Sequence, residues 1–327
     1  MTTTSHPYDA LTPDVVLDAV DATGLHADGR LLALASYENR VYQVGLDDES
    51  FVVAKFYRPG RWSDAAIHEE HAFTQALAEN EIPAVPPLRN SAGDTLSHFA
   101  GFRLAVFPRR GGRTPELEDP SVLEWLGRFI GRIHAQGALA TYQHRPVLDV
   151  ETFGRLPGRF LLEGGWPPPE IRTAYEGVLQ QVLDGVAACF EAVGSIKIIR
   201  LHGDCHPGNV LWTDQGPHFV DFDDTCTGPS IQDLWMLLSG ERAEMTRQLA
   251  DLVAGYEDFA EFDPRQVRLI EALRSLRLIH YAAWLARRWD DPAFPHSFPW
   301  FNTRAWWDEH IAALNNQLER MAQPWLF

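Results

Sequence analysis

The stretch RLHGDCHPGNVLW, residues 200–212, places an acid, an amide and two imidazoles between apolar flanks. Its ends are typical of strands, so we expect the polar residues on a loop that one strand presents. Two simple interpretations are open at this point. His202, Cys205 and His206 could bind a metal, or the segment could be an ordinary polar turn. The rest of the chain is needed to decide.

Composition limits the possible functions. At 327 residues, with 45% hydrophobic and 22% charged residues, the chain is long enough for two lobes of a globular protein. The formal net charge of -17 argues against nucleic acid or an anionic membrane surface as a partner. We find no apolar run of about 18 residues that would span a membrane. Three cysteines at unpatterned spacing and an N-terminus without signal-peptide features predict a cytoplasmic protein with free thiols.

Strand-like runs occupy the first third of the chain, at residues 30–36, 39–46, 50–57 and 101–107, with a helical pattern over 63–80. These runs predict a small, mostly antiparallel sheet that carries one helix. From about Ser121 onward helical patterns dominate, and they are interrupted only around the quoted stretch. We therefore expect an α+β fold of two lobes, a sheet lobe over residues 1–107 and a larger, mainly helical lobe over 108–327, with ligands bound between them.

Two charged residues of the sheet lobe stand in apolar surroundings. Lys55 lies in the middle of the run FVVAKFY, and Glu70 falls on the apolar stripe of the helix over 63–80. Because a charge that faces inward needs a partner, we expect a Lys55–Glu70 ion pair; the alternative is that Lys55 points to solvent.

The segment HEEH, residues 68–71, contains Glu70 and has two histidines that could suggest a zinc site. We expect it to be surface helix, since its histidines lack the zinc-site spacing and a clear third ligand.

Oxygen ligands offer a third interpretation of the quoted stretch. Asp204 and Asn209 lie five residues apart, and Asp221 follows in VDFDD, 17 residues after Asp204. Amide and carboxylate oxygens from two loops suit Mg²⁺, which keeps several waters and takes further ligands from substrate phosphates. A carboxylate that the metal does not need can orient and deprotonate an attacking hydroxyl. With a lysine to hold phosphates, these residues predict a phosphoryl-transfer site.

The ordered set of motifs resembles a known family. HGDCHPGNVLW followed by FVDFDD resembles the signature of the aminoglycoside phosphotransferase and choline kinase superfamily, which has a protein-kinase-like fold. The similarity continues through SYENRVYQV, FVVAKFYRPGRW, QDLWMLL and FPHSFPWFNTRAWW to a group of cytoplasmic bacterial Ser/Thr protein kinases. The resemblance implies a small antiparallel-sheet N-lobe, a larger helical C-lobe, ATP and Mg²⁺ as cofactors, and a role in stress response.

The resemblance also implies roles for individual residues. Asp204 and Asp221 would be catalytic, the first as the base that aligns the acceptor hydroxyl. Asn209 and Asp221 would bind Mg²⁺. Lys55, positioned by Glu70, would bind the nucleotide phosphates.

Other positions follow the family pattern less closely. Ser36 matches the phosphate-covering turn, although SYENR replaces the Gly-rich loop there. Val106 and Phe107 fall at the hinge, where backbone groups would bind adenine. Asp233 resembles the helix aspartate that braces the catalytic loop by accepting backbone hydrogen bonds, the alternative being a simple helix cap. The aromatic segment from Asp290 onward is expected to clamp a terminal helix rather than line a binding surface.

The function implied is that of an ATP- and Mg²⁺-dependent Ser/Thr protein kinase, a monomer whose partner is a protein with a Ser or Thr acceptor. One alternative is a small-molecule kinase of the aminoglycoside, choline or homoserine type, which would use the same site residues. A second alternative is a pseudokinase, a non-catalytic binding module. The complete set of site residues argues against the pseudokinase, since the loss of one of them is its usual sign.

Overall fold

The computed structural model describes residues 6, 8–323 and 325. The chain divides into two compact units. Unit 1 contains the chain up to Pro115, together with Tyr142–Arg145 and Pro207–Thr225. Unit 2 contains Glu116–Thr141, Pro146–His206 and the chain from Cys226 onward. Each unit is therefore assembled from segments that are distant in the sequence.

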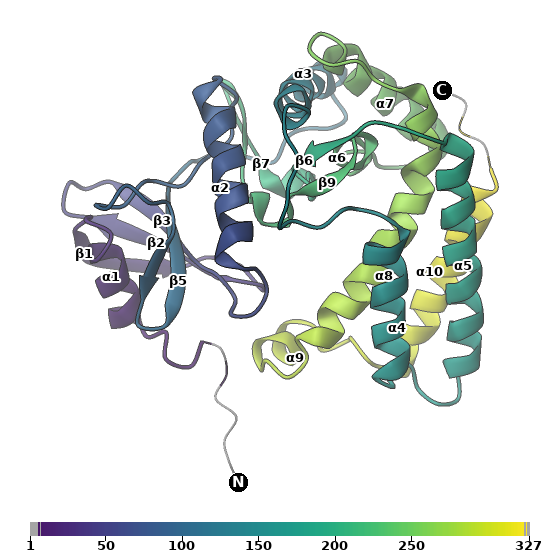
Figure 1. Ribbon diagram of the computed structural model, residues 1–327, viewed down its shortest axis with the longest axis horizontal. Helices are drawn as coiled ribbons and strands as arrows, with labels where there is room; N and C mark the ends of the chain where they lie inside the picture. Colours follow the sequence, from purple (N-terminus) through teal and green to yellow (C-terminus); the bar gives the residue numbers. More distant parts are fainter. Residues whose placement is uncertain (1–5, 7, 324, 326–327) are drawn as a thin grey trace. The chain divides into compact units, whose positions relative to one another are not determined.

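Unit 1 contains the predicted antiparallel sheet (Figure 1). Its five strands run in the order β1-β2-β3-β5-β4, and each neighbouring pair is antiparallel. The strands are β1 (Ala27–Ala33), β2 (Arg40–Leu46), β3 (Phe51–Phe56), β4 (Ser97–Phe99) and β5 (Phe102–Pro108). Two helices accompany them, α1 (Pro13–Asp21) and α2 (Asp64–Glu79). The sheet, and the helix between its third and fourth predicted strands, are confirmed.

Apolar residues on the strands and helices explain how unit 1 holds together. Alternate positions of β3, such as Ala54 and Phe56, are fully buried in a core that also contains Val16 and Val20 of α1. On α2, the predicted stripe of Ile67, Phe73 and Leu77 is fully buried. The Ser63 side chain accepts a hydrogen bond from the Ala66 N–H and so caps this helix at its N-terminus. Local sequence thus fixes where the helix begins and which face it buries.

A second hairpin joins unit 1 from far along the chain. It consists of β7 (Val210–Thr213) and β8 (Gly216–Phe219), flanked by the 3₁₀ turns η2 (Pro207–Asn209) and η3 (Phe222–Asp224). Arg113 and Trp212 exchange backbone hydrogen bonds of 2.9 and 2.7 Å, and the Val85 N–H donates to the Phe219 carbonyl at 3.1 Å. The sequence analysis divides the chain into two lobes at residue 107, whereas the hairpin at residues 207–225 belongs to unit 1. The hydrogen bonds just described join this hairpin to unit 1.

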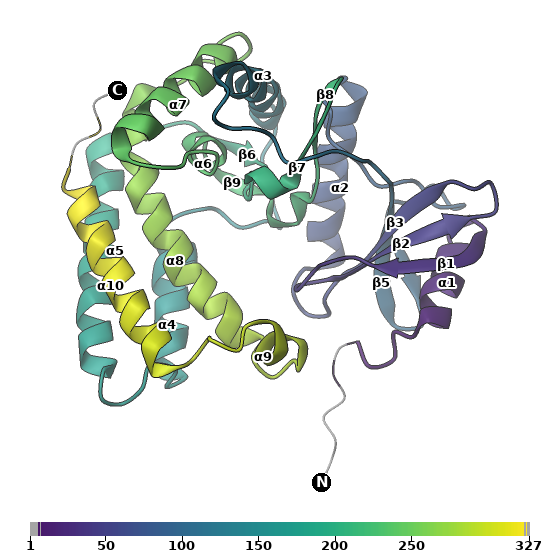
Figure 2. The ribbon, with the colours of Figure 1, turned by 180° about the vertical axis from the view of Figure 1, so that it is seen from behind.

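Unit 2 is mainly helical (Figure 2). Its elements include one short antiparallel pair, β6 (Ile198–Leu201) with β9 (Cys226–Pro229). Its helices are α3 (Pro120–Gly137), η1 (Glu151–Arg155), α4 (Leu156–Glu163), α5 (Arg172–Val193), α6 (Ile231–Trp235), α7 (Arg242–Tyr256), η4 (Pro264–Leu269), α8 (Ile270–Arg287), α9 (Ala293–Ser297) and α10 (Arg304–Met321). The α+β fold expected from the sequence is confirmed.

Aromatic side chains fasten the end of the chain to unit 2. Phe294, Phe301 and Trp307 are each at most 2% exposed, and Trp307 packs edge-to-face on Tyr175 of α5. Figure 2 shows α10 beside α5 and α8. The aromatic segment therefore clamps a terminal helix, as predicted. Among the described helices, none combines the length and apolar character that crossing a bilayer requires.

Candidate phosphoryl-transfer site

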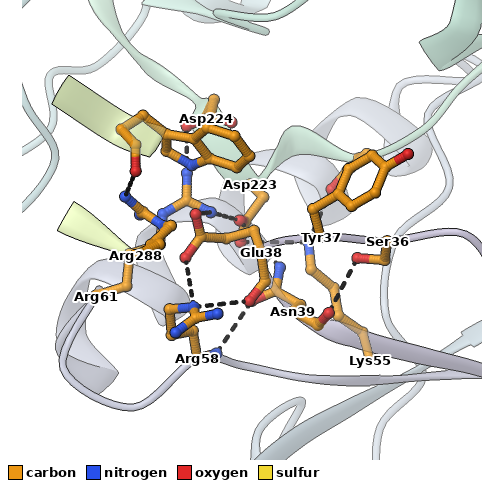
Figure 3. Close-up of polar contacts among 12 residues, drawn as sticks. Ser36, Tyr37, Glu38, Asn39, Lys55, Arg58, Arg61, Asp223, Asp224 and Arg288 are labelled. Atoms are coloured by element: carbon orange, nitrogen blue, oxygen red, sulfur yellow. Dashed lines mark hydrogen bonds and ion pairs between the residues drawn. The ribbon is translucent and has the colours of Figure 1, made fainter. Parts of the chain in front are cut away.

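Lys55 lies in a cluster of charged side chains in unit 1, and Figure 3 shows it together with Asn39, Arg61 and Asp223. Its ammonium lies 2.8 Å from Asp221 Oδ1 and 3.2 Å from Asp223 Oδ1. The second carboxylate oxygen of Asp223 pairs with Arg61 and accepts a hydrogen bond of 3.1 Å from Asn39 Nδ2. We call Lys55, Arg61, Glu70, Arg145, Asp221 and Asp223 the charge cluster. Because Lys55 is held by two carboxylates, it does not point to solvent.

Glu70 also faces inward, but its partner differs from the predicted one. It pairs with Arg145 Nη2 at 2.9 Å, and no ion pair joins it to Lys55 in the described part of the chain. Arg145 also donates to the backbone carbonyls of Asp223 (2.7 Å) and Ala66 (2.8 Å). The predicted Lys55–Glu70 pair is therefore wrong, because the loop at Asp221–Asp223 neutralises Lys55 and an arginine from a distant segment neutralises Glu70.

Electrostatics support charged side chains in this cluster. Burial alone would lower the pKa of Lys55, but Asp221 and Asp223 outweigh it and raise that pKa well above its ordinary value. Burial would raise the pKa of Asp223, but Arg61 and Lys55 hold it well below its usual range. Burial raises the pKa of Glu70 against the opposing influence of Lys55 and Arg145. Glu70 thus remains within electrostatic reach of Lys55 without contacting it.

The HEEH segment lies only partly on the surface. His68 is half-buried, whereas His71 is 1% exposed. The His71 ring hydrogen-bonds the Tyr57 hydroxyl through Nε2 and the Thr95 hydroxyl through Nδ1, each at 2.8 Å. Burial is the main reason that the pKa of His71 falls to about 3, so the ring is neutral at pH 7. The expectation of a surface helix is therefore wrong for His71, which is a buried and hydrogen-bonded histidine.

Ser36 lies in the turn before β2 that replaces a Gly-rich loop. Its hydroxyl donates to the Asn39 carbonyl at 3.1 Å, which closes the turn. The Asn39 side chain bonds both Asp223 and the Arg58 N–H, the latter at 3.0 Å. The turn is thus anchored to the charge cluster through Asn39. The role of Ser36 in binding phosphates stays a prediction.

Asn209 and Asp221 are brought close together by the hairpin that separates them in sequence. The Val220 N–H donates to the Asn209 carbonyl at 3.0 Å, which fixes the residue next to Asp221. Asp221 adopts the left-handed conformation (φ 60°), which is costly for a non-glycine residue and is often retained where function needs it. Its carboxylate is 56% exposed, and Oδ2 makes no hydrogen bond or ion pair with another described residue. This donor set fits a Mg²⁺ ion that keeps most of its waters.

The predicted hinge residues lie within the sheet. Val106 pairs with Ala54 and Phe107 with Val53 in the β3–β5 ladder, which continues to Pro108. The Val106 carbonyl already accepts a hydrogen bond of 2.7 Å from the Leu88 N–H. A carbonyl oxygen has two lone pairs, so this hydrogen bond leaves the Val106 carbonyl one further acceptor position. Adenine binding by the backbone groups of Val106 and Phe107 stays a prediction.

Asp204 lies in the loop after β6, in unit 2, and this loop is braced by Asp233 of α6. The buried Asp233 carboxylate accepts hydrogen bonds from the His202 N–H (2.8 Å) and the Gly203 N–H (2.9 Å). It also contacts His134 Nε2 of α3 at 2.9 Å. The brace predicted for Asp233 is confirmed. His202 and His134 are each 1% exposed and support the loop from within.

The Asp204 carboxylate is paired with an arginine and has a histidine close by. Arg277 Nη1 on α8 lies 2.6 Å from Oδ1, and His206 Nε2 lies 3.6 Å from Oδ2. Although burial opposes it, Arg277 and His206 lower the pKa of Asp204. The carboxylate is thus ionised and able to accept a hydrogen bond from an acceptor hydroxyl. Burial raises the pKa of the Cys205 thiol well above its usual value, so this cysteine is a poor nucleophile.

Several residues of the site carried no clear sequence signal. Arg145 and Arg277 belong to none of the motifs quoted above, and Arg61 lies in FVVAKFYRPGRW without a predicted role. Each of the three pairs with a carboxylate distant in the chain. Asp223 could have been found, because it stands in VDFDD directly after the predicted metal ligand. A second aspartate there is a departure from the DFG pattern, and its buried carboxylate is compensated by Lys55 and Arg61.

These features are those of a phosphotransferase with a protein-kinase-like fold, and the comparisons agree. Residues 30–270 match the phosphotransferase enzyme family, and the chain belongs to this family. It is 40% identical over 324 residues to "Stress response kinase A" of Escherichia coli (strain K12), covering 99% of this chain and 98% of the relative. It is also 40% identical over 317 residues to "Serine/threonine protein kinase RdoA" of Salmonella typhimurium, covering 97% of this chain and 95% of the relative. The resemblance predicted from the motifs is confirmed.

Solved structures share the fold at low identity. The structure "Amicoumacin kinase hAmiN in complex with AMP-PNP, Ca2+ and Ami" matches with a TM-score of 0.71 at 19% identity, covering 92% of this chain and 91% of that one. A microcompartment-associated aminopropanol kinase matches with a TM-score of 0.71 at 18% identity, covering 95% and 96%. These likenesses support the fold alone.

Proposed function

We propose that this phosphotransferase transfers the γ-phosphoryl group of ATP, with Mg²⁺, to serine or threonine hydroxyls of a protein. The observation that carries the proposal is the pairing of Lys55 with Asp221, beside Asn209, in a chain whose relative over nearly full length is named a Ser/Thr kinase. Mg²⁺ would supply a bridge between phosphate oxygens and neutralise their charge. Asn209 and Asp221 would hold it.

Each residue has a definite part in this proposal. Lys55 would bind phosphate oxygens, and its two carboxylate partners keep it charged and in place without a ligand. Asp204 would accept a hydrogen bond from the acceptor hydroxyl. Its lowered pKa makes it a weak base, which suits phosphoryl transfer because the loose transition state needs orientation of the hydroxyl more than early removal of its proton.

The biological setting is also part of the proposal. The relatives are named for stress response, and we propose the same role here. We further propose that the protein acts as a monomer in the cytoplasm on a protein partner. The charge of -17 disfavours nucleic acid and anionic membranes as partners.

The test is transfer from labelled ATP in the presence of Mg²⁺ to a panel of protein and small-molecule acceptors. We expect phosphoserine or phosphothreonine in protein, in the kinase itself or in an added acceptor, and loss of labelling when EDTA removes the metal. An Asp204→Asn enzyme should label at least about a hundredfold more slowly than wild type. Asp214→Asn, the same change at an exposed loop position, should behave as wild type. Labelling confined to small metabolites would assign the chain to the small-molecule kinases. The absence of both transfer and ATP hydrolysis would identify a pseudokinase.

A further inference from the structure

The carboxylate of the candidate base is paired with an arginine that lies outside the motifs quoted above. Arg277 Nη1 lies 2.6 Å from Asp204 Oδ1, and the arginine side chain is 47% exposed. Its Nε and Nη2 make no hydrogen bond or ion pair with other described residues. Since a guanidinium carries five donors, most of the donors of Arg277 remain available to a ligand beside the base.

The side chains that act on Asp204 within unit 2 are basic, and the Arg277 guanidinium is a permanent cation among them. The strongest electrostatic influences on Asp204 come from Arg277, His206 and His202, although the whole chain carries a net charge of -17. An acceptor with an ammonium group next to its hydroxyl would place like charges together at this position, which is unfavourable. An acceptor with a carboxylate or phosphate there would gain a charge-assisted contact with the Nε and Nη2 donors of Arg277.

The unit to which Arg277 belongs indicates which substrate it binds, the nucleotide or the acceptor. The candidate nucleotide and metal residues Ser36, Lys55, Asn209 and Asp221 all belong to unit 1. Asp204 and Arg277 belong to unit 2. In the proposed function the base contacts the acceptor hydroxyl. An arginine paired with that base is therefore placed to bind the acceptor rather than the nucleotide.

We propose that Arg277 is a specificity-determining residue, which binds an anionic group close to the acceptor hydroxyl. The substrate is then a serine or threonine in an acidic segment. The choice of a peptide substrate rests on the proposed function, whereas the preference for an anionic acceptor does not. The anion is either the carboxylate of a neighbouring Asp or Glu or the phosphate of a neighbouring phosphoserine, and both present oxygens to the same guanidinium.

Peptides with one Ser/Thr core and with Glu, phosphoserine, Ala or Lys flanks test the preference. We expect kcat/KM for an anionic flank to exceed that for Ala by about tenfold or more, as for hydrogen bonds to a charged group. The better of the two anionic flanks identifies the source of the anion. Arg277→Ala should lose the preference through a higher KM for the anionic peptide, and Arg277→Glu should favour Lys flanks. Arg268→Ala, which removes an exposed arginine just before α8, is the matched control and should keep the preference.

Small acceptors separate this inference from the proposed function. Glycolate and ethanolamine are of similar size, and each has one hydroxyl, but they carry opposite charges. If no peptide is labelled and glycolate is preferred, the protein-kinase proposal fails while the role of Arg277 stands. A preference for ethanolamine or for Lys-flanked peptides overturns the role of Arg277. The role of Arg277 is also overturned if Arg277→Ala lowers kcat equally for all acceptors and leaves KM unchanged. That result is expected of a residue that only positions Asp204.

Discussion

The charge cluster of unit 1 and the Asp204 loop of unit 2 hold charged side chains in different ways. In the cluster, Lys55 and Asp223 have side chains only 7% and 4% exposed, and ion pairs compensate their burial. Asp204 in the loop and its partner Arg277 on α8 are 23% and 47% exposed, and Asp233 fixes the backbone just before Asp204. One region depends on charge pairing, and the other depends on a backbone brace around an accessible carboxylate.

This difference separates stability from activity. A buried ion pair costs desolvation free energy, and removing one partner leaves the other charge buried and uncompensated. An accessible pair is worth little to stability, because water solvates either partner alone. Changes in the charge cluster should therefore lower the free energy of unfolding, while a change of Asp204 should act on catalysis.

The largest effect is expected for Asp204→Asn. The amide is nearly the same size as the carboxylate, but it is a weaker acceptor for the substrate hydroxyl, so we expect kcat to fall by about 10²- to 10⁴-fold. The free energy of unfolding should change by less than about 1 kcal/mol, since the Arg277 pair is accessible to water. Rate measurements and chemical denaturation of the same preparation check both. A large loss of stability would show that the loop, too, depends on charge pairing.

The charge cluster should respond in the opposite way to Arg145→Met. This change leaves the Glu70 carboxylate and the carbonyls of Ala66 and Asp223 buried without their donor. We expect a loss of about 3–5 kcal/mol in the free energy of unfolding, measured by chemical denaturation. Arg110→Met, at an exposed position of unit 1, is the control. Adding Glu70→Gln to Arg145→Met should recover part of the loss, because an amide is less costly to bury than a charge; no recovery would assign the effect to packing.

A smaller effect on both properties is expected for Asp233→Asn. The amide keeps one oxygen to accept a backbone hydrogen bond but cannot serve both the His202 and Gly203 N–H groups as the carboxylate does. We expect a loss of about 1–3 kcal/mol of stability and a reduced kcat. The temperature dependence of kcat, compared with that of wild type, checks whether the loop has loosened. Unchanged turnover would mean that the remaining hydrogen bonds suffice to hold Asp204.

The sequence predicted the elements of both regions, but it did not predict the ion-pair partners of their charged residues. Strand alternation, helix periodicity and the Ser63 cap are local signals, so the sheet, α2 and the inward direction of Glu70 could all be predicted. Periodicity shows that a charge is buried, but it does not identify the partner. Arg145 lies 75 residues from Glu70, and local sequence carries no trace of that contact.

The same limit applies at Asp204. The motif indicated the base, the loop and the Asp233 brace, because their spacing recurs in a known family. Arg277 lies 73 residues away on α8 and reaches the base only because the helices of unit 2 pack as they do. Such contacts depend on tertiary structure, which local sequence patterns do not encode.

Acid conditions should affect stability through buried histidines, and His71 beside the charge cluster tests this for unit 1. Its pKa is lowered from 6.5 to about 3 in the folded state, so between these values the unfolded chain binds a proton that the folded chain does not. Stability is therefore complete above about pH 6.5 and falls as the pH decreases, by about 1.4 kcal/mol per pH unit for one group.

Chemical denaturation at pH 7.5 and pH 5.5 measures this loss. His310 of unit 2, whose pKa burial lowers to about 4, should contribute a similar loss. His71→Gln removes the titrating group. The fall in the free energy of unfolding between pH 7.5 and pH 5.5 should therefore be smaller in this variant than in wild type, by roughly 1 kcal/mol. His310→Gln is the matched variant for unit 2, and comparing the two assigns the acid sensitivity to one unit or both. If His71→Gln loses as much stability between the two pH values as wild type does, the His71 ring can be protonated in the folded state. The region beside the charge cluster would then admit water.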